Sequence, residues 1–111
     1  MAKRQLRLRP EVAAFAQEME RKLRANDWKG GWKDNDVRGL MARVVEELAE
    51  VIPTVGQDPT AVELLELVSA KLEDMLPRRR KMSPRRVLEE SADVANMLMM
   101  VADVCGALAA K

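Results

Sequence analysis

Residues 90–105 read Glu-Ser-Ala-Asp-Val-Ala-Asn-Met-Leu-Met-Met-Val-Ala-Asp-Val-Cys, and this stretch decides the fold of the chain. After Asp93, apolar side chains occupy nearly every side of the helix that it predicts. A helix of this kind is usually central in its bundle, because all of its sides must be shielded from water. Asn96 and Asp103 make the run too short and too polar to cross a membrane. We therefore expect a buried helix in a soluble protein of a reducing, cytoplasmic compartment.

Three more helices are expected ahead of this one, because apolar residues recur with helical spacing and no segment alternates like a strand. Proline suits the first turn of a helix, and Asp, Asn or Ser suits the position before it. Asn35 or Asp36 should cap the second helix, and Pro53 should stop it after Ile52. The fold class is therefore all-α, a four-helix bundle. The expected helices cover about residues 10–26, 36–52, 59–77 and 84–109.

Length and composition limit both the number of domains and the chemistry. The 111 residues have room for one domain, which we assign to residues 1–111, with a basic tail at 1–9 and a basic linker at 77–83. Nineteen basic and eighteen acidic residues leave a net charge of +1, so we do not expect nucleic acid as a partner. Histidine is absent and Cys105 is the single cysteine, which we read as a small core residue. His-based metal sites, His general bases and Cys-type zinc sites are thereby excluded within one chain.

Two acidic clusters lie on two of the expected helices. They are Glu46-Glu47-Leu48-Ala49-Glu50 on the second helix and Glu90-Ser91-Ala92-Asp93 on the fourth. Each contains carboxylates three residues apart, which lie on one side of a helix, one turn from each other. Like charges at this spacing repel, and burying an ion is costlier still, so a chain with two such pairs is expected to hold a divalent cation between them. Oxygen-only ligands suit Mg²⁺, with Mn²⁺ as the alternative.

Helical geometry separates the carboxylates by direction. On the second helix, Glu47 lies at the margin of the apolar stripe with Glu50 on the same side, whereas Glu46 faces mostly solvent. Arg43 shares their flank and could neutralise either inward carboxylate in a metal-free state. The pair on the fourth helix lies on or beside a packed side. The inward quartet expected to hold the metal is Glu47, Glu50, Glu90 and Asp93. The alternative is that these acids are solvated helix faces paired with arginines.

The order Glu-Glu-x-x-Glu, spacer, Glu-x-x-Asp resembles that of the MazG-like all-α nucleoside triphosphate pyrophosphohydrolases. Val44-Val45, the run from Ser91 to Met100 and the Trp-Lys-Gly-Gly-Trp-Lys of residues 28–33 agree with it, so the resemblance spans roughly residues 25–105. It implies Mg²⁺-dependent hydrolysis of a (deoxy)nucleoside triphosphate between the α- and β-phosphates, which gives the monophosphate and pyrophosphate. It also implies that the inward quartet holds Mg²⁺ and that Glu46 or Glu47 orients or deprotonates the attacking water. The spacer, residues 51–89, is longer than the family pattern and contains an additional helix.

Several other residues are candidates for contact with the nucleotide. Aromatic rings can stack on a base, and basic side chains can contact phosphate oxygens. Each kind of residue also has a structural alternative. The two tryptophans could close the end of the bundle as a lid, the lysines and arginines could be solvated, and Asn96 could be an amide at a helix interface. The expected substrate-binding residues are Trp28, Lys29, Trp32, Lys33, Asn96, Arg79 and Arg86.

The apolar fourth helix gives a single 111-residue bundle more hydrophobic surface than it needs. We therefore expect a homodimer or homotetramer whose active site is near, or completed by, the subunit interface. The competing function is a non-catalytic helical interaction protein that binds a partner or nucleic acid through Arg78–Arg86. The four inward acids favour the enzyme, because a binding module has no use for them.

Overall fold

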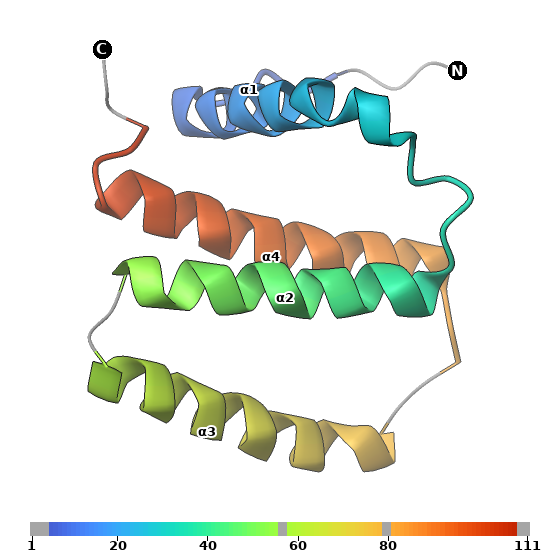
Figure 1. The fold of residues 1–111 in the computed structure, drawn as a ribbon, viewed down its shortest axis with the longest axis vertical. Helices are drawn as coiled ribbons and strands as arrows, with labels where there is room; N and C mark the ends of the chain where they lie inside the picture. Colours follow the sequence, from blue (N-terminus) through green and yellow to red (C-terminus); the bar gives the residue numbers. More distant parts are fainter. Residues whose placement is uncertain (1–4, 56–57, 79–80, 109–111) are drawn as a thin grey trace. The chain divides into compact units, whose positions relative to one another are not determined.

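The computed structural model describes residues 5–55, 58–78 and 81–108, and the regular structure within these ranges is helical (Figure 1). The expectation of an all-α chain with four helices and no strand is confirmed for this part of the chain. None of the described helices is both long and apolar enough to cross a lipid bilayer. The elements are α1 (Pro10–Ala25), the 3₁₀ helix η1 (Asp27–Lys29), α2 (Val37–Val55), α3 (Asp58–Met75), the 3₁₀ helix η2 (Leu76–Arg78) and α4 (Pro84–Val104).

The helices form two compact units, α1 with α4 and α2 with α3. We call Met1–Gly31 together with Met82–Lys111 the terminal unit, and Trp32–Lys81 the middle unit. The structure describes each unit by itself. The first acidic cluster therefore belongs to the middle unit, on α2, and the second belongs to the terminal unit, on α4.

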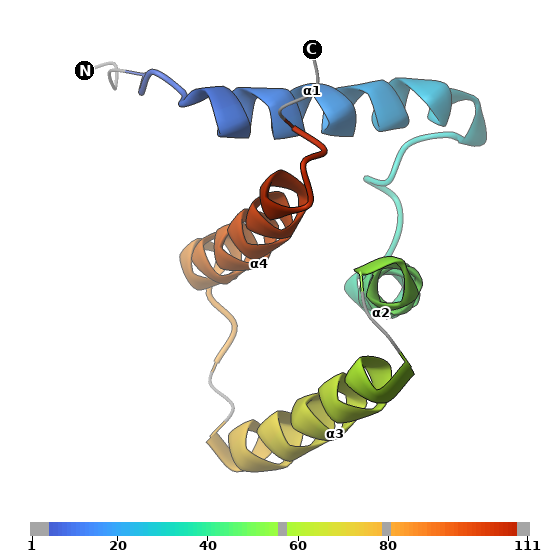
Figure 2. The same ribbon diagram turned by 90° about the vertical axis from the view of Figure 1, so that its left-hand side faces the viewer.

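In the terminal unit, the first turns of α1 pack against the C-terminal part of α4 (Figures 1 and 2). Half-buried side chains on α4 are spaced at three and four residues, which gives one continuous stripe along the helix. The half-buried or buried side chains of the two helices include Val12, Ala13, Ala14 and Phe15 on α1, and Ala95, Leu98, Met99 and Ala102 on α4.

Met99 is the one buried side chain among the described residues, at 8% exposure. The middle unit has half-buried Leu40, Val51 and Ile52 on α2 and Leu64 on α3. Large apolar side chains on all four helices remain exposed, because a pair of helices shares only one face. Among them are Met19, Leu23, Val44, Val45, Leu65, Leu72, Val94, Met97 and Met100.

The start of α2 is capped by Asp36, one of the two caps that the sequence predicts. Its Oδ1 accepts a hydrogen bond of 2.8 Å from the backbone N–H of Gly39. The predicted stop before Pro53 is wrong, because α2 continues through this proline to Val55. Proline has a backbone φ close to that of a helix, so α2 can run through it, although the ring supplies no N–H and crowds the carbonyl of the preceding turn. The Thr54 hydroxyl also donates to the carbonyl of Val51 at 2.6 Å.

The start of α4 follows the prediction, but its end does not. The Ser83 Oγ accepts a hydrogen bond of 3.3 Å from the Arg86 N–H, and Pro84 is the first helical residue. The predicted end near Ala109 is wrong, because α4 stops at Val104. Gly106 adopts a φ of 83°, a left-handed conformation that favours glycine.

Backbone hydrogen bonds around Gly106 form a Schellman motif. The N–H of Gly106 donates to the carbonyl of Asp103 at 2.9 Å, and the N–H of Ala107 donates to that of Ala102 at 2.9 Å. These bonds use carbonyls that a longer helix would pair with later residues. Gly106 therefore terminates the helix and is the sequence signal for its end.

The remaining expected boundaries are close to those observed. Asn26 directly follows α1, as expected. The third helix, expected to reach residue 77, ends as α3 at Met75, and the 3₁₀ helix η2 follows it through Arg78. The first residues of the predicted linker at 77–83 are therefore helical. The expected turn at Gly56-Gln57, residues 1–4 of the basic tail, and Arg79 and Arg80 lie outside the described residues.

The Asp36 cap gives a first prediction. Asp36→Ala should lower the free energy of unfolding by about 1 kcal/mol, because α2 loses the acceptor for the Gly39 N–H. Thermal and urea unfolding, followed by circular dichroism, measure this change. Asp34→Ala removes the same charge, and no hydrogen bond of Asp34 is described, so it should stay within about 0.5 kcal/mol of the parent. Equal stability of the two variants would contradict a role for the cap.

Candidate functional site

The first acidic cluster lies in the middle of α2, and its carboxylates are exposed in the described structure. The Glu46 and Glu47 side chains are 66% and 64% exposed. Arg43 lies one turn earlier, with its Nε 3.3 Å from Glu46 Oε1 and its Nη2 3.7 Å from Glu47 Oε2. The sequence predicts that Arg43 neutralises Glu47 or Glu50. Among the described residues, Arg43 pairs with Glu47 and also with Glu46, and no ion pair includes Glu50.

The second acidic cluster lies in the first half of α4, and both of its carboxylates are exposed. The ion pairs of the described residues include neither Glu90 nor Asp93. The nearby Arg85 pairs with Glu89 instead, at 3.0 Å. Asn96 is also exposed, three residues after Asp93. The charges of this pair are therefore left without a protein counter-ion in the part of the chain that the structure describes.

The two acidic pairs belong to different units. Within either unit, as far as it is described, no three acidic or cysteine side chains gather closely enough to hold a metal ion. A metal site that uses both pairs therefore requires α2 and α4 together, and their meeting stays a prediction. The donor chemistry fits such a site, because carboxylate oxygens suit a hard cation such as Mg²⁺. The guanidinium of Arg43 forms ion pairs with two of the carboxylates, those of Glu46 and Glu47.

The alternative that the acids are solvated faces paired with arginines holds for part of the set. Arg43 accounts for Glu46 and Glu47 in this way. No described ion pair accounts for Glu50 or for the two acids on α4. All of these acids are exposed, which agrees with the solvated part of the alternative; in the described contacts only the arginine partners of Glu50, Glu90 and Asp93 are missing.

The two Trp-Lys pairs lie between α1 and α2. Trp28 is in η1 and is 79% exposed, with the Lys29 Nζ 5.4 Å from the centroid of its ring, a cation–π distance. Gly30 follows with a φ of 88°. Trp32 is 51% exposed and belongs with Lys33 to the middle unit. An exposed ring is available for stacking, and neither tryptophan is buried as a plug.

The basic segment is partly neutralised within the chain. The Arg78 Nη2 lies 3.3 Å from Asp74, and the Arg85 Nε lies 3.0 Å from Glu89. Arg86 is exposed in the first turn of α4, which contains no acidic residue. Its positive charge lies at the positive end of the helix dipole, which is unfavourable unless an anion is near. Of the predicted phosphate contacts in this segment, Arg86 is exposed in the described structure, and Arg79 lies outside the described residues.

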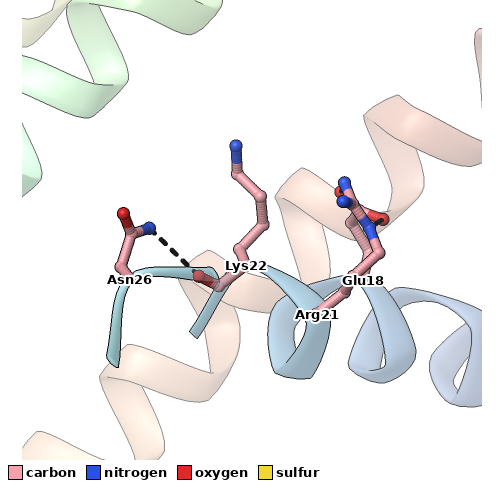
Figure 3. A network of polar contacts seen from close by, with 4 residues as sticks. All are labelled: Glu18, Arg21, Lys22 and Asn26. Carbon is pink, nitrogen blue, oxygen red and sulfur yellow. Dashed lines mark hydrogen bonds and ion pairs between the residues drawn. The ribbon is translucent and has the colours of Figure 1, made fainter. Parts of the chain in front are cut away.

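The structure contains an apolar groove on α1 that the sequence did not lead us to predict. Its volume is about 390 Å³, and apolar Phe15, Met19 and Leu23 line it at four-residue intervals. Figure 3 shows polar contacts on the same helix: the Asn26 Nδ2 donates to the Lys22 carbonyl at 3.0 Å, and the Arg21 Nε donates to Glu18 at 3.0 Å. The side-chain hydrogen bond from Arg21 lowers the pKa of Glu18. The apolar residues at every fourth position of this segment predict an apolar helix face.

Comparison with known proteins does not identify a relative. A scan against protein-family models finds no match, and searches of curated proteins and of solved structures find none either. The MazG-like resemblance therefore stays a prediction, carried by the acidic motifs on α2 and α4.

Proposed function

We propose that this protein is a Mg²⁺-dependent nucleoside triphosphate pyrophosphohydrolase of the MazG-like type, with Mn²⁺ as an alternative metal. It hydrolyses a (deoxy)nucleoside triphosphate between the α- and β-phosphates. The observation that carries the proposal is the pair of carboxylates on each of α2 and α4, of which Glu50, Glu90 and Asp93 have no described protein counter-ion. Repulsion within each pair disfavours this arrangement unless a cation offsets it.

In this proposal, Glu47 and Glu50 from α2 and Glu90 and Asp93 from α4 hold the metal. Held by these carboxylates, Mg²⁺ would supply neutralisation of phosphate oxygens and a lower pKa of the attacking water. Glu46, beside Glu47 on the flank of α2, orients that water or accepts its proton. Its exposed side chain supports this role, because water must reach it.

The nucleotide is bound by aromatic and basic groups outside the acidic motifs. Trp28 stacks on the base, and its 79% exposure supports this role. Lys29, beside the same ring, brings positive charge to the phosphates. Trp32, Lys33, Asn96, Arg79 and Arg86 complete the proposed substrate-binding set.

The assembly that we propose is a homodimer or homotetramer of MazG-like four-helix bundles, with the active site near the subunit interface. The exposed apolar side chains of all four helices support it, since water is a poor solvent for such surfaces. The groove on α1 is an apolar face of the kind that another helix covers. Large exposed apolar patches are common at interfaces and rare on soluble monomers.

The competing function, binding of a partner or nucleic acid through Arg78–Arg86, has less support. Asp74 and Glu89 already neutralise two arginines of this segment. The net charge of +1 also gives no general attraction to nucleic acid.

Incubation of the purified protein with a panel of dNTPs and NTPs plus Mg²⁺ tests the activity. At least one nucleotide should yield its monophosphate and pyrophosphate, which anion-exchange chromatography separates. Omission of the metal, or excess EDTA, should abolish the reaction. Release of inorganic phosphate with a diphosphate product would contradict cleavage at the proposed bond. No turnover of any nucleotide would contradict the enzyme altogether.

Neutralising single acids tests the site. Glu47→Gln and Asp93→Asn should each lower kcat/KM by about a hundredfold or more, because each removes a ligand of the catalytic metal. Without metal, their melting temperatures should equal or slightly exceed that of the parent, since like-charge repulsion is relieved. Glu66→Gln, a neutralised exposed acid on α3, is the matched control and should keep full activity. Unimpaired turnover in either site variant would refute the assignment of that residue.

Size-exclusion chromatography with light scattering tests the assembly. The 12.5 kDa chain should elute with the mass of a dimer or tetramer. Leu23→Glu places a charge in the apolar groove and should shift the mass toward the monomer. Gln17→Glu adds the same charge to an exposed position outside the groove and should leave the mass unchanged. A wild-type protein that is monomeric at micromolar concentration would contradict the proposed oligomer.

A further inference from the structure

The apolar face of α1 continues beyond the turns that pack against α4. Half-buried side chains on α1 end at Phe15, and every residue from Ala16 to Ala25 is exposed. The groove lies along this second part, where Met19 and Leu23 remain 52% and 43% exposed. Among the described residues, those that line the groove all belong to α1 and its C-cap, Asn26. A partner that covers this face is therefore not among the described contacts of α1.

One edge of the groove carries an acid and a base. Glu18 and Lys22 line it one turn apart, on the same side of the helix. Arg21, which does not line the groove, donates to Glu18 at 3.0 Å (Figure 3), but a carboxylate has about four acceptor sites and can accept further donors. The ion pairs of the described residues do not include Lys22. This edge therefore offers both a carboxylate and an ammonium group to the partner.

A second copy of α1 in antiparallel orientation matches both the groove and its charged edge. When the two grooves face each other across a two-fold axis at Met19, Phe15 of one helix lies level with Leu23 of the other. The charged edges of the two helices then lie on the same side of the pair. Glu18 is only about 3 Å along the helix axis from Lys22 of the second copy, and the symmetry repeats this pair. In a parallel pair the two edges lie on opposite sides, so these charges do not meet.

We propose that the groove on α1 binds the same groove of a second copy, with the two α1 helices antiparallel. The inference rests on the homo-oligomer of the proposed function and names its contact surface, and it does not depend on the enzymatic activity. The apolar side chains of the groove supply affinity as they leave water. The reciprocal Glu18–Lys22 pairs fix the orientation, because charge complementarity sets register and specificity more than affinity.

Disulfide cross-linking of the full-length protein tests this inference. Each variant carries Cys105→Ser, so that the introduced cysteine is the only one. Mild oxidation should join Met19→Cys rapidly into a covalent dimer, because its two copies meet at the axis. Leu23→Cys should not be joined, because its two copies lie about 12 Å apart along an antiparallel pair, too far for a disulfide. Gln17→Cys, on the opposite face of α1, gives the background rate of chance collisions.

Charge variants of Met19→Cys extend the same experiment to the edge of the groove. Lys22→Glu should lower the cross-linking rate about tenfold, because both symmetric pairs become repulsive. The exchange Glu18→Lys with Lys22→Glu restores opposite charges across the axis and should recover most of the rate. Arg24→Glu makes the same change in net charge on the face away from the groove and should leave the rate nearly unchanged.

The outcomes separate the inference from the proposed assembly. Rapid cross-linking of Met19→Cys, slowed by Lys22→Glu and recovered by the exchange, supports the antiparallel contact. Cross-linking of Met19→Cys at the rate of Gln17→Cys overturns it, because something other than a second α1 then covers the groove. Equally rapid cross-linking of Leu23→Cys also overturns it, because the helices would then be parallel. A wild type that is oligomeric by light scattering without this cross-link keeps the proposed assembly, whereas a monomeric wild type overturns both. The nucleotide panel tests the enzymatic activity separately.

Discussion

An α-helix gains most of its stability in water from the apolar face that it buries, and each unit of this chain offers a helix one partner only. Met99 alone becomes buried among the described residues, while α4 still exposes Val94, Met97 and Met100. A helix that is apolar on several sides is satisfied only when neighbours cover those sides. The four-helix bundle and the oligomer that we propose would both cover these apolar sides. Both would also bring further helices to the faces that border the acidic motifs.

Repulsion between carboxylates also affects the stability of two of these helices, α2 and α4. On α2, the glutamates repel one another and are only partly offset by Arg43. On α4, the two acids follow a first turn that contains Arg85 and Arg86 but no acidic residue. Arg85 is engaged by Glu89, so the basic turn leaves Glu90 and Asp93 without an arginine partner in the described contacts. Both helices therefore carry negative charge that a bound cation would offset, and this links the proposed chemistry to the stability of the helices.

Local signals in the sequence predicted the local structure well. Asp36 and Ser83 cap their helices as expected, because a short polar side chain before a helix satisfies a free backbone N–H. The predictions for two residues were wrong: Pro53 was expected to end α2, and Gly106 was expected to lie within α4. The backbone φ of proline is compatible with a helix, whereas a glycine with positive φ closes the Schellman motif. The sequence placed both acidic pairs on helices and predicted that Arg43 neutralises Glu47 or Glu50, of which it pairs with Glu47. The meeting of α2 with α4 depends on long-range packing that no local pattern encodes.

The terminal unit is built from the two ends of the chain, with the whole middle unit inserted between them. The hairpin of α2 and α3 is contiguous, so its contacts close short loops and form early in folding. The contact of α1 with α4 must instead close a loop that contains residues 26–83, and it cannot form until α4 has left the ribosome. Throughout synthesis, α1 therefore exposes its apolar face without its partner. Topology therefore favours early formation of the hairpin with Glu46, Glu47 and Glu50, and later formation of the contact that α4, with Glu90 and Asp93, makes with α1.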